Sequence, residues 1–204
     1  MNVLQLKSSI LGSNSASSRL ADEFVARLAE QNSSLNVVER DLGADPVPHL
    51  DGARAAAFFA KPEERTEEQR ALIDYSDALI AELRRADVLV LGLPMYNFGV
   101  PSQLKAWFDH IARAGETFKY TDKGSVGLMK GKKAYVFAAR GGVYGGDVHS
   151  QTQFVRQFLE FIGIAEVEFV YAEGLAIGPD SRNTSIASAR GEARRLALAT
   201  RLAA

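Results

Sequence analysis

The sequence VLVLGLPMYNFGVP, residues 88–101, joins a continuous apolar run to an aromatic loop that ends in a proline. An uninterrupted apolar run like residues 88–91 suits a parallel strand that is covered on both faces. Pro101 suits the first turn of a helix. Apolar residues then recur at the helical spacing i, i+3, i+4 and i+7. They are Leu104, Trp107, Phe108 and Ile111. The segment therefore predicts a buried strand, a loop and a helix in succession.

The same alternation extends in both directions along the chain. The strand candidates are residues 3–6, 35–38, 88–91, 135–138 and 167–171. Amphipathic stretches lie between them; one opens with a capping box at residues 66–69, and a terminal helix is expected over residues 183–202. Five β-α units in a row predict a parallel sheet with right-handed crossovers and helices on both faces. The expected fold is a three-layer α/β/α sandwich with the flavodoxin-like strand order 2-1-3-4-5.

One segment interrupts the alternation, at about residues 116–130. Residues 117–121 are β-prone, and Asp122-Lys123-Gly124 is typical of a turn, so an inserted hairpin is expected. The 204 residues otherwise suit a single domain, 1–204, with this excursion.

Composition excludes several classes of protein. The formal net charge of −1 argues against a nucleic-acid-binding surface or a basic membrane patch. The chain has no cysteine, which excludes disulfides, thiolate nucleophiles and cysteine metal sites. Its three histidines share no metal-ligand spacing, so no metal site is expected. Neither a signal peptide nor an apolar run of membrane-spanning length is visible, and a cytoplasmic location is expected.

In a sheet of this order a ligand binds beyond the carboxyl ends of the strands, beside strands 1 and 3. Three loops are placed there. Residues 8–18 are rich in serine and precede a helix, whose N-terminus attracts phosphate; alternatively, the serines only cap that helix. Residues 94–101 offer Met95 and Phe98 to a flat ring, unless these side chains fold back onto the core. Residues 140–146 contain four glycines that admit close backbone approach, or simply form a flexible loop.

The chain resembles the bacterial FMN-dependent NADH azoreductases, also called NADH:quinone oxidoreductases. The resemblance covers essentially the whole chain in order. It rests on these segments: Ser8-Ser9-Ile10-Leu11, Ser15-Ala16-Ser17, Pro94-Met95-Tyr96-Asn97-Phe98, Gln103-Leu104-Lys105, Ala112-Arg113-Ala114-Gly115, Thr117-Phe118-Lys119-Tyr120-Thr121, Gly131-Lys132-Lys133, Arg140-Gly141-Gly142 and Ala172-Glu173-Gly174.

This resemblance implies a set of binding residues and an assembly. The FMN phosphate would be held by Ser9, Ser15, Ala16 and Ser17. The isoalloxazine ring would be held by Met95, Tyr96, Asn97 and Phe98, and by Ala139, Arg140, Gly141 and Gly142. A homodimer is implied, with its active sites at the subunit interface and Tyr120, Phe161 and Tyr171 contributing to the acceptor pocket.

Two features depart from the family pattern. Ala139 stands where relatives can carry serine, which removes a side-chain contact but leaves the backbone contacts intact. Residues 145–147 belong to a segment that varies in the family, and we expect this segment to influence substrate choice.

The expected activity is two-electron transfer from NADH or NADPH to quinones and azo compounds, with FMN carrying the chemistry and no catalytic side chain required. A single pocket for both the nicotinamide and the acceptor would make the two substrates bind in turn, which gives ping-pong kinetics. Two other hypotheses stay open: a flavodoxin-type electron carrier without an organic substrate, and a non-catalytic ligand-binding domain. A serine hydrolase is disfavoured because no G-x-S-x-G motif occurs. His110 is expected to be a structural residue of its helix.

Overall fold

The computed structural model describes residues 1–200 and contains a five-stranded parallel sheet of order β2-β1-β3-β6-β7. The sheet strands are β1 (Asn2–Lys7), β2 (Asn36–Asp41), β3 (Val88–Pro94), β6 (Lys133–Ala139) and β7 (Glu166–Ala172). With the hairpin left out, this order is 2-1-3-4-5 of the sheet strands, so the predicted topology is confirmed. Every residue of β3 is buried, as its apolar run predicts for the central strand.

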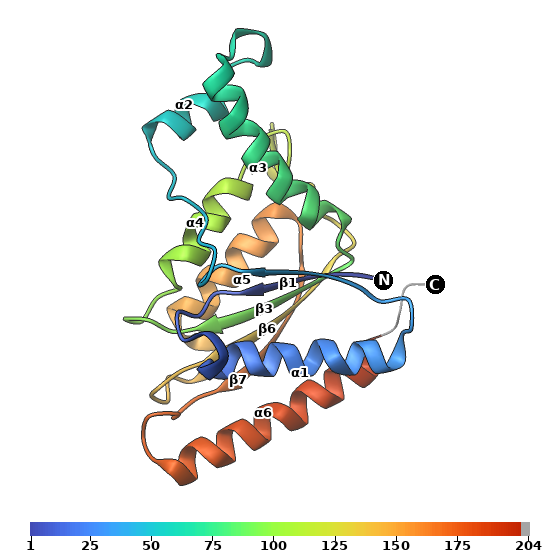
Figure 1. The fold of residues 1–204 in the computed structure, drawn as a ribbon, viewed down its shortest axis with the longest axis vertical. Helices are drawn as coiled ribbons and strands as arrows, with labels where there is room; N and C mark the ends of the chain where they lie inside the picture. Colours follow the sequence, from blue (N-terminus) through green and yellow to red (C-terminus); the bar gives the residue numbers. More distant parts are fainter. Residues whose placement is uncertain (201–204) are drawn as a thin grey trace.

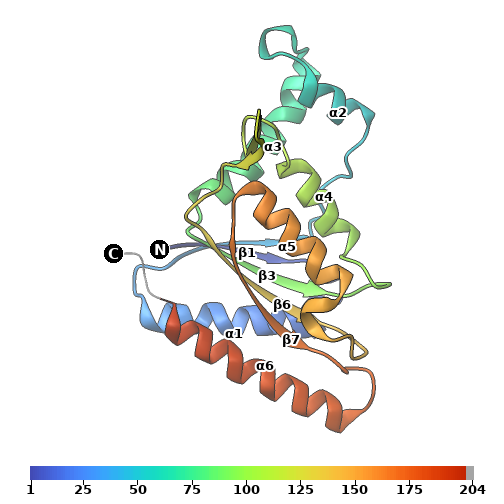
Figure 2. The same cartoon turned by 180° about the vertical axis from the view of Figure 1, so that it is seen from behind.

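Six α-helices accompany the strands over these residues. They are α1 (Ala16–Gln31), α2 (Gly52–Phe59), α3 (Glu67–Arg85), α4 (Ser102–Ile111), α5 (Ser150–Ile162) and α6 (Pro179–Ala199). Figure 1 shows α1 and α6 on one face of the sheet and α3, α4 and α5 on the other. Figure 2 shows the same three layers from behind. None of the helices within residues 1–200 is long and apolar enough to cross a membrane.

The two layers of the core follow from alternation along the strands, because successive side chains point to opposite faces. In β3, Leu89, Leu91 and Leu93 join the cluster under α3, α4 and α5. Val88 and Val90 join the cluster under α1 and α6. The sandwich therefore buries both faces of its central strand, which fixes the strand's position and the loop that follows it.

Helix starts agree with the sequence in some places and differ in others. Thr66 and Gln69 form the predicted capping box at the start of α3. Pro101 precedes the first residue of α4 and acts as its N-cap, rather than lying inside the first turn. The last helix begins at Pro179, four residues before the expected start, because proline suits the first helical position. Its expected end at residue 202 lies outside the described residues.

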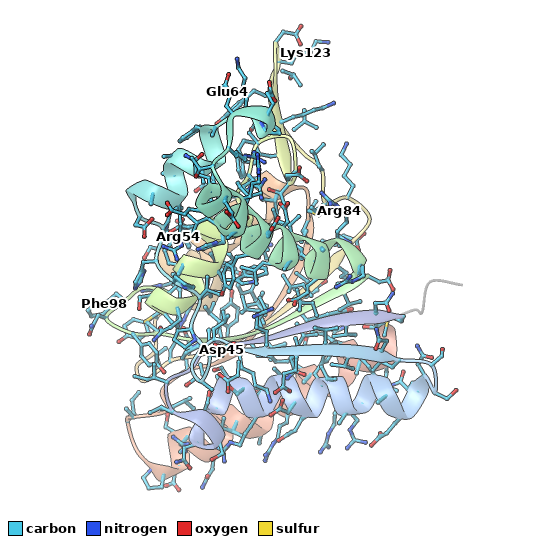
Figure 3. All side chains as sticks on the ribbon, turned by 45° about the horizontal axis from the view of Figure 1, so that its top comes forward. Asp45, Arg54, Glu64, Arg84, Phe98 and Lys123 are labelled. Carbon is cyan, nitrogen blue, oxygen red and sulfur yellow. The ribbon has the colours of Figure 1, made fainter. Side chains whose placement is uncertain are left out.

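The excursion forms the predicted hairpin, from β4 (Phe118–Thr121) and β5 (Gly124–Gly127), which pair antiparallel. It lies at the end of the molecule toward which α2 and the first turns of α3 project (Figures 1 and 2). Figure 3 shows Lys123, at the tip of this hairpin, well away from Phe98 in the loop after β3.

Candidate functional site

The three predicted loops follow β1, β3 and β6, which are neighbours in the sheet. These strands are parallel and pair in register, β1 with β3 and β3 with β6. Their carboxyl ends therefore meet at one edge, and the loops after them lie side by side. This is the edge at which sheets of this class bind ligands.

The first loop buries its serine hydroxyls at the start of α1. Ser15 is the N-cap, and its Oγ accepts the N–H of Ser18 at 3.1 Å. The Oγ of Ser17 lies 3.1 Å from that of Ser15, and both residues are almost fully buried. Within residues 1–200, the N–H groups of Ala16 and Ser17 have no hydrogen-bond acceptor. The loop thus caps its helix and still leaves these two N–H donors without an acceptor in the described part of the chain, beside buried neutral hydroxyls, a set of groups that suits a phosphate.

Two glycines let the neighbouring backbone come close to this loop. A Cβ on Gly92 would lie 3.3 Å from backbone atoms of Ser17, so glycine lets the start of α1 pack against β3. A Cβ on Gly43 would lie 2.2 Å from the carbonyl oxygen of Ser9, a distance that no side chain tolerates. The Ser8 hydroxyl also donates to the carbonyl of Gly92 at 2.7 Å. The loop at residues 8–18 is therefore held in close contact with Gly92 of β3 and with Gly43.

The second loop is a tight turn that turns its aromatic side chain outward. Tyr96 and Gly99 exchange backbone hydrogen bonds of 3.3 and 3.0 Å. Asn97 and Phe98 between them have positive φ angles, 49° and 66°, a strained conformation for a bulky residue such as Phe98. Phe98 is 65% exposed, so this side chain does not fold back onto the core. Figure 3 shows it at the margin of the molecule.

The Tyr96 hydroxyl joins the second loop to the first. It is hydrogen-bonded to the Ser9 hydroxyl at 3.0 Å and accepts the N–H of Ile10 at 3.1 Å. Met95 is half-buried, and its N–H donates to the carbonyl of Ala139 at 3.0 Å, so the strand ends of β3 and β6 are also joined. The three loops are therefore one connected structure.

The third loop is fastened by a buried arginine. The guanidinium of Arg140 donates to Glu173 at 2.8 Å, to Thr152 at 2.6 Å and to Gln151 and the carbonyl of Gly146 at 3.2 Å each. Its side chain has no exposed surface. The Arg140 side chain is thus engaged inside the protein and is not directed at a ligand. The loop is held in place along its length.

Gly141 has room for a side chain in the protein itself. Among the atoms of residues 1–200, a Cβ there would meet only the Cβ of Ala176, at an ordinary contact distance of 3.4 Å. Its φ is not among the positive values in the chain. The fold therefore does not require glycine at 141, whereas a ligand lying against the backbone at this exposed position would.

The three residues predicted for the acceptor pocket do not meet within one subunit. Tyr120 is 74% exposed on the hairpin, and its neighbour Phe118 packs against Phe161 with ring centroids 4.4 Å apart. Tyr171 lies at the end of β7, where its hydroxyl donates to Asp147 at 2.7 Å and to Thr152 at 3.4 Å. Thr152 and Phe161 are separated by about 14 Å along α5, at 1.5 Å per residue. A pocket that uses all three residues stays a prediction.

Burial shifts the pKa of two residues, Tyr171 and His110. Burial raises the pKa of the Tyr171 hydroxyl, so this group stays protonated near neutral pH. Burial lowers the pKa of His110, whose Nε2 lies 3.0 Å from the carbonyl oxygen of Pro48. His110 lies under α2 and α3 rather than at the carboxyl edge, since it contacts Phe58 and Tyr75. Among residues 1–200, no three acidic or histidine side chains are grouped as metal ligands.

Sequence reasoning missed the partners of Arg140. Glu173, Gln151 and Thr152 received no role, although Glu173 lies in one of the motifs. The signal was in the strand ends: Ala139 and Ala172 are opposite each other in register, so Arg140 and Glu173 follow neighbouring strands at the same level. An arginine and a glutamate at adjacent strand ends predict an ion pair once the strand order is known.

The residues present fit FMN. One end of the site offers N–H groups and buried hydroxyls for a phosphate, next to the start of α1. The other end offers an exposed aromatic turn and a glycine with space for a flat ring. An elongated ligand with a dianion at one end and a flat polar ring at the other matches both ends.

The fold and the site together define a flavodoxin-like protein, and a family model described as "Flavodoxin-like fold" matches residues 1–197. Curated relatives narrow this class. An FMN-dependent NADH:quinone oxidoreductase of Cellvibrio japonicus is 51% identical over 191 residues, which cover 93% of this chain and 95% of the relative. One of Burkholderia pseudomallei is 54% identical over 189 residues, covering 92% and 96%. The chain belongs to this family of FMN-dependent NADH:quinone oxidoreductases.

Solved structures agree with this assignment. The structure of an azoreductase from Bacillus anthracis str. Sterne has a TM-score of 0.90 to this chain at 30% identity, covering 98% of this chain and all of the other. An FMN-dependent NADH-azoreductase from Bacillus anthracis str. Ames Ancestor, in complex with FMN, has a TM-score of 0.85 at 28% identity, covering 96% and 99%.

Proposed function

We propose that this chain is an FMN-dependent oxidoreductase that transfers two electrons from NADH or NADPH to quinones and azo compounds. The observation that carries the proposal is the meeting of three loops at the carboxyl edge of β1, β3 and β6. The N–H groups and serine hydroxyls at the start of α1 form the phosphate-type end of this site. The turn at Phe98 and the loop at residues 140–146 form its ring-type end. Family membership supports the same cofactor and reaction. Residues 1–204 act as a single flavodoxin-like domain, in the cytoplasm.

In this proposal the phosphate is bound by the N–H groups at the start of α1 and by the serine hydroxyls. The binding residues there are Ser9, Ser15, Ala16 and Ser17. The ring is bound by Met95, Tyr96, Asn97, Phe98 and the backbone of residues 139–142. When bound, FMN supplies the chemistry by taking a hydride from the nicotinamide and passing two electrons to the acceptor.

Donor and acceptor use the same space in turn. The described edge offers one ring-type end, and the sequence has no G-x-G-x-x-G motif for a second nucleotide. The protein orients first the nicotinamide and then the acceptor against the turn at Phe98 and the glycine loop, residues 140–146. No acidic side chain is needed at the acceptor, because water can supply the protons.

The enzyme is a homodimer with an acceptor pocket built by both chains. Support comes from the separation of Tyr171 from Tyr120 and Phe161 within one subunit, and from the exposed Tyr120 ring on a projecting hairpin. A strictly monomeric mass at micromolar concentration, together with full activity, would disprove this part of the proposal. Sedimentation of the purified protein measures it.

The decisive experiment is the absorption spectrum of the purified, FMN-reconstituted protein before and after anaerobic NADH. The proposal predicts loss of the oxidised flavin band on NADH addition, and its return when a quinone is added. An electron carrier would hold FMN but would not react with NADH at an enzymatic rate. A non-catalytic ligand-binding domain would bind neither FMN nor NADH, or would bind them without turnover.

Steady-state kinetics test the shared space. Plots of reciprocal rate against reciprocal NADH concentration should give parallel lines at several quinone concentrations. Intersecting lines, with a detectable complex that holds both substrates, would require a separate nicotinamide site.

A further inference from the structure

We propose that Glu173, Arg140 and Gln151 form a positioning network that fixes the two ring-binding loops relative to each other. This inference rests on the proposed function, because it concerns the loops that hold the flavin ring. None of the three side chains is assigned to touch the cofactor. Their task is to hold the backbone that does.

The centre of the network is the Arg140 guanidinium, which is enclosed and donates four hydrogen bonds. It donates to the Glu173 carboxylate, the Thr152 hydroxyl, the Gln151 amide oxygen and the carbonyl of Gly146. The backbone of Arg140 is bonded as well: its N–H donates to the carbonyl of Ala172 at 2.8 Å. The residue that opens the glycine loop is therefore fixed at both its backbone and its side chain.

Glu173 then fixes the far half of the same loop. Its carboxylate accepts three consecutive backbone N–H groups, those of Tyr144, Gly145 and Gly146, at 3.2 to 3.3 Å. Burial would raise the pKa of this carboxyl, but the hydrogen bonds from Arg140 and the backbone outweigh burial and lower it. The carboxylate is therefore charged near neutral pH and gathers a glycine-rich loop around itself.

Gln151 connects this assembly to the aromatic turn. While its amide oxygen accepts from Arg140, its amide nitrogen donates to the carbonyls of Pro94 and Gly99, both at 2.9 Å. Those two carbonyls bracket the strained turn at Asn97 and Phe98. Gln151 is buried at the start of α5, so one rigid helix holds both loops in a single register.

Stability alone is a weak reason for such a cluster, because a buried ion pair is often no more stabilising than apolar residues of the same size. A polar cluster does specify one arrangement, since each donor has one matching acceptor. Binding sites depend on this kind of support: a misplacement of about 1 Å caused far from the reacting atoms can cost about 100-fold in rate.

The test uses two near-isosteric variants, each with a matched control. Glu173→Gln keeps the size of the side chain but replaces one acceptor oxygen with a donor. Its control is Glu192→Gln, which removes a glutamate paired with Arg195 at 2.6 Å on the surface of α6. Gln151→Met removes the link between the loops, and its control is Gln157→Met, an exposed position on the same helix.

Three measurements are made at a temperature well below melting: the FMN dissociation constant, the visible circular dichroism of bound flavin, and kcat and KM for the quinone. The proposal predicts FMN binding weakened about tenfold or more, an altered flavin dichroism and a lowered kcat for both network variants. Both controls should match the wild type.

The inference is overturned if both network variants melt at a lower temperature but bind FMN with wild-type affinity, dichroism and kcat, because the network would then be structural only. Failure of the proposed function is a separate result. In that case the wild-type protein itself would not bind FMN or react with NADH.

Discussion

The two ends of the candidate site are built on opposite principles. In the loop at residues 8–18, the polar groups are left available: the N–H groups of Ala16 and Ser17 have no acceptor within residues 1–200. In the loop at residues 140–146, the polar groups are consumed internally by Arg140 and Glu173. The first end binds with its own atoms, and the second end binds with a backbone that other atoms hold. Substitutions at the two ends should therefore fail in different ways.

The largest effect is expected from Arg140→Met, and it should fall on folding. Removing one partner of a buried pair leaves Glu173 without its cation and three backbone N–H groups around a poorly compensated charge. Loss of such a partner typically costs about 3–5 kcal/mol. Chemical denaturation of the apoprotein measures it. Arg195→Met, at an exposed pair, should change the unfolding free energy far less, because exposed ion pairs contribute little. Equal effects of the two variants would contradict the structural role of Arg140.

The opposite signature is expected from Ser17→Ala, at the phosphate-type end. A hydrogen bond to a charged group contributes about 1.5–3 kcal/mol, so the affinity for FMN should fall roughly 10- to 150-fold. Folding should change little, because within residues 1–200 the Ser17 Oγ has only the hydroxyl of Ser15 as a partner. Fluorescence titration of the apoprotein with FMN gives the affinity. Unchanged affinity would remove Ser17 from the phosphate site.

Sequence patterns predicted the sheet, and with it the edge at which the three loops meet, because the strands are recognised by local periodicity. The apolar run of β3 and the capping box at Thr66 are signals carried by neighbouring residues. The interior of the glycine loop was not predictable in the same way. Arg140 was assigned to the cofactor on the motif alone, whereas its side chain turns to Glu173 and Gln151, 33 and 11 residues further along the chain. Pairings of that kind depend on strand order and register.

A smaller and more selective effect is expected from Gly141→Val. The protein has room for a Cβ at this position, so the apoprotein should melt near the wild-type temperature. A branched side chain would intrude on a ring that lies against the backbone, and overpacking of this kind costs roughly 1–3 kcal/mol. FMN content and turnover should both fall. A variant with normal melting, FMN content and turnover would show that this glycine only permits a loop.

The smallest effect concerns pH and separates the two ends of the site. The loop at residues 8–18 contains no ionisable side chain, whereas the other end depends on the Glu173 carboxylate. Its pKa in the folded protein is lowered from the ordinary value, by hydrogen bonds from Arg140 and the backbone that outweigh the opposing effect of burial. The folded state therefore favours the charged form. The stability that this carboxylate contributes is fully present above its ordinary pKa and is lost as pH falls through the folded value.

The measurement is the unfolding free energy of the apoprotein from pH 7 down to pH 3, compared between the wild type and Glu173→Gln. Other carboxyl groups contribute to both proteins, so the difference between the two curves isolates Glu173. That difference should be constant near neutral pH and shrink as the solution becomes acidic.

Glu192→Gln provides the contrast, because the pKa of Glu192 is also lowered, by its hydrogen bond with Arg195, but at an exposed site. In about 1 M sodium chloride, where the screening length is about 3 Å, the Glu192 difference should largely vanish while the Glu173 difference remains. If salt removes both differences equally, Glu173 acts as a surface charge, and the distinction between the two ends of the site does not hold.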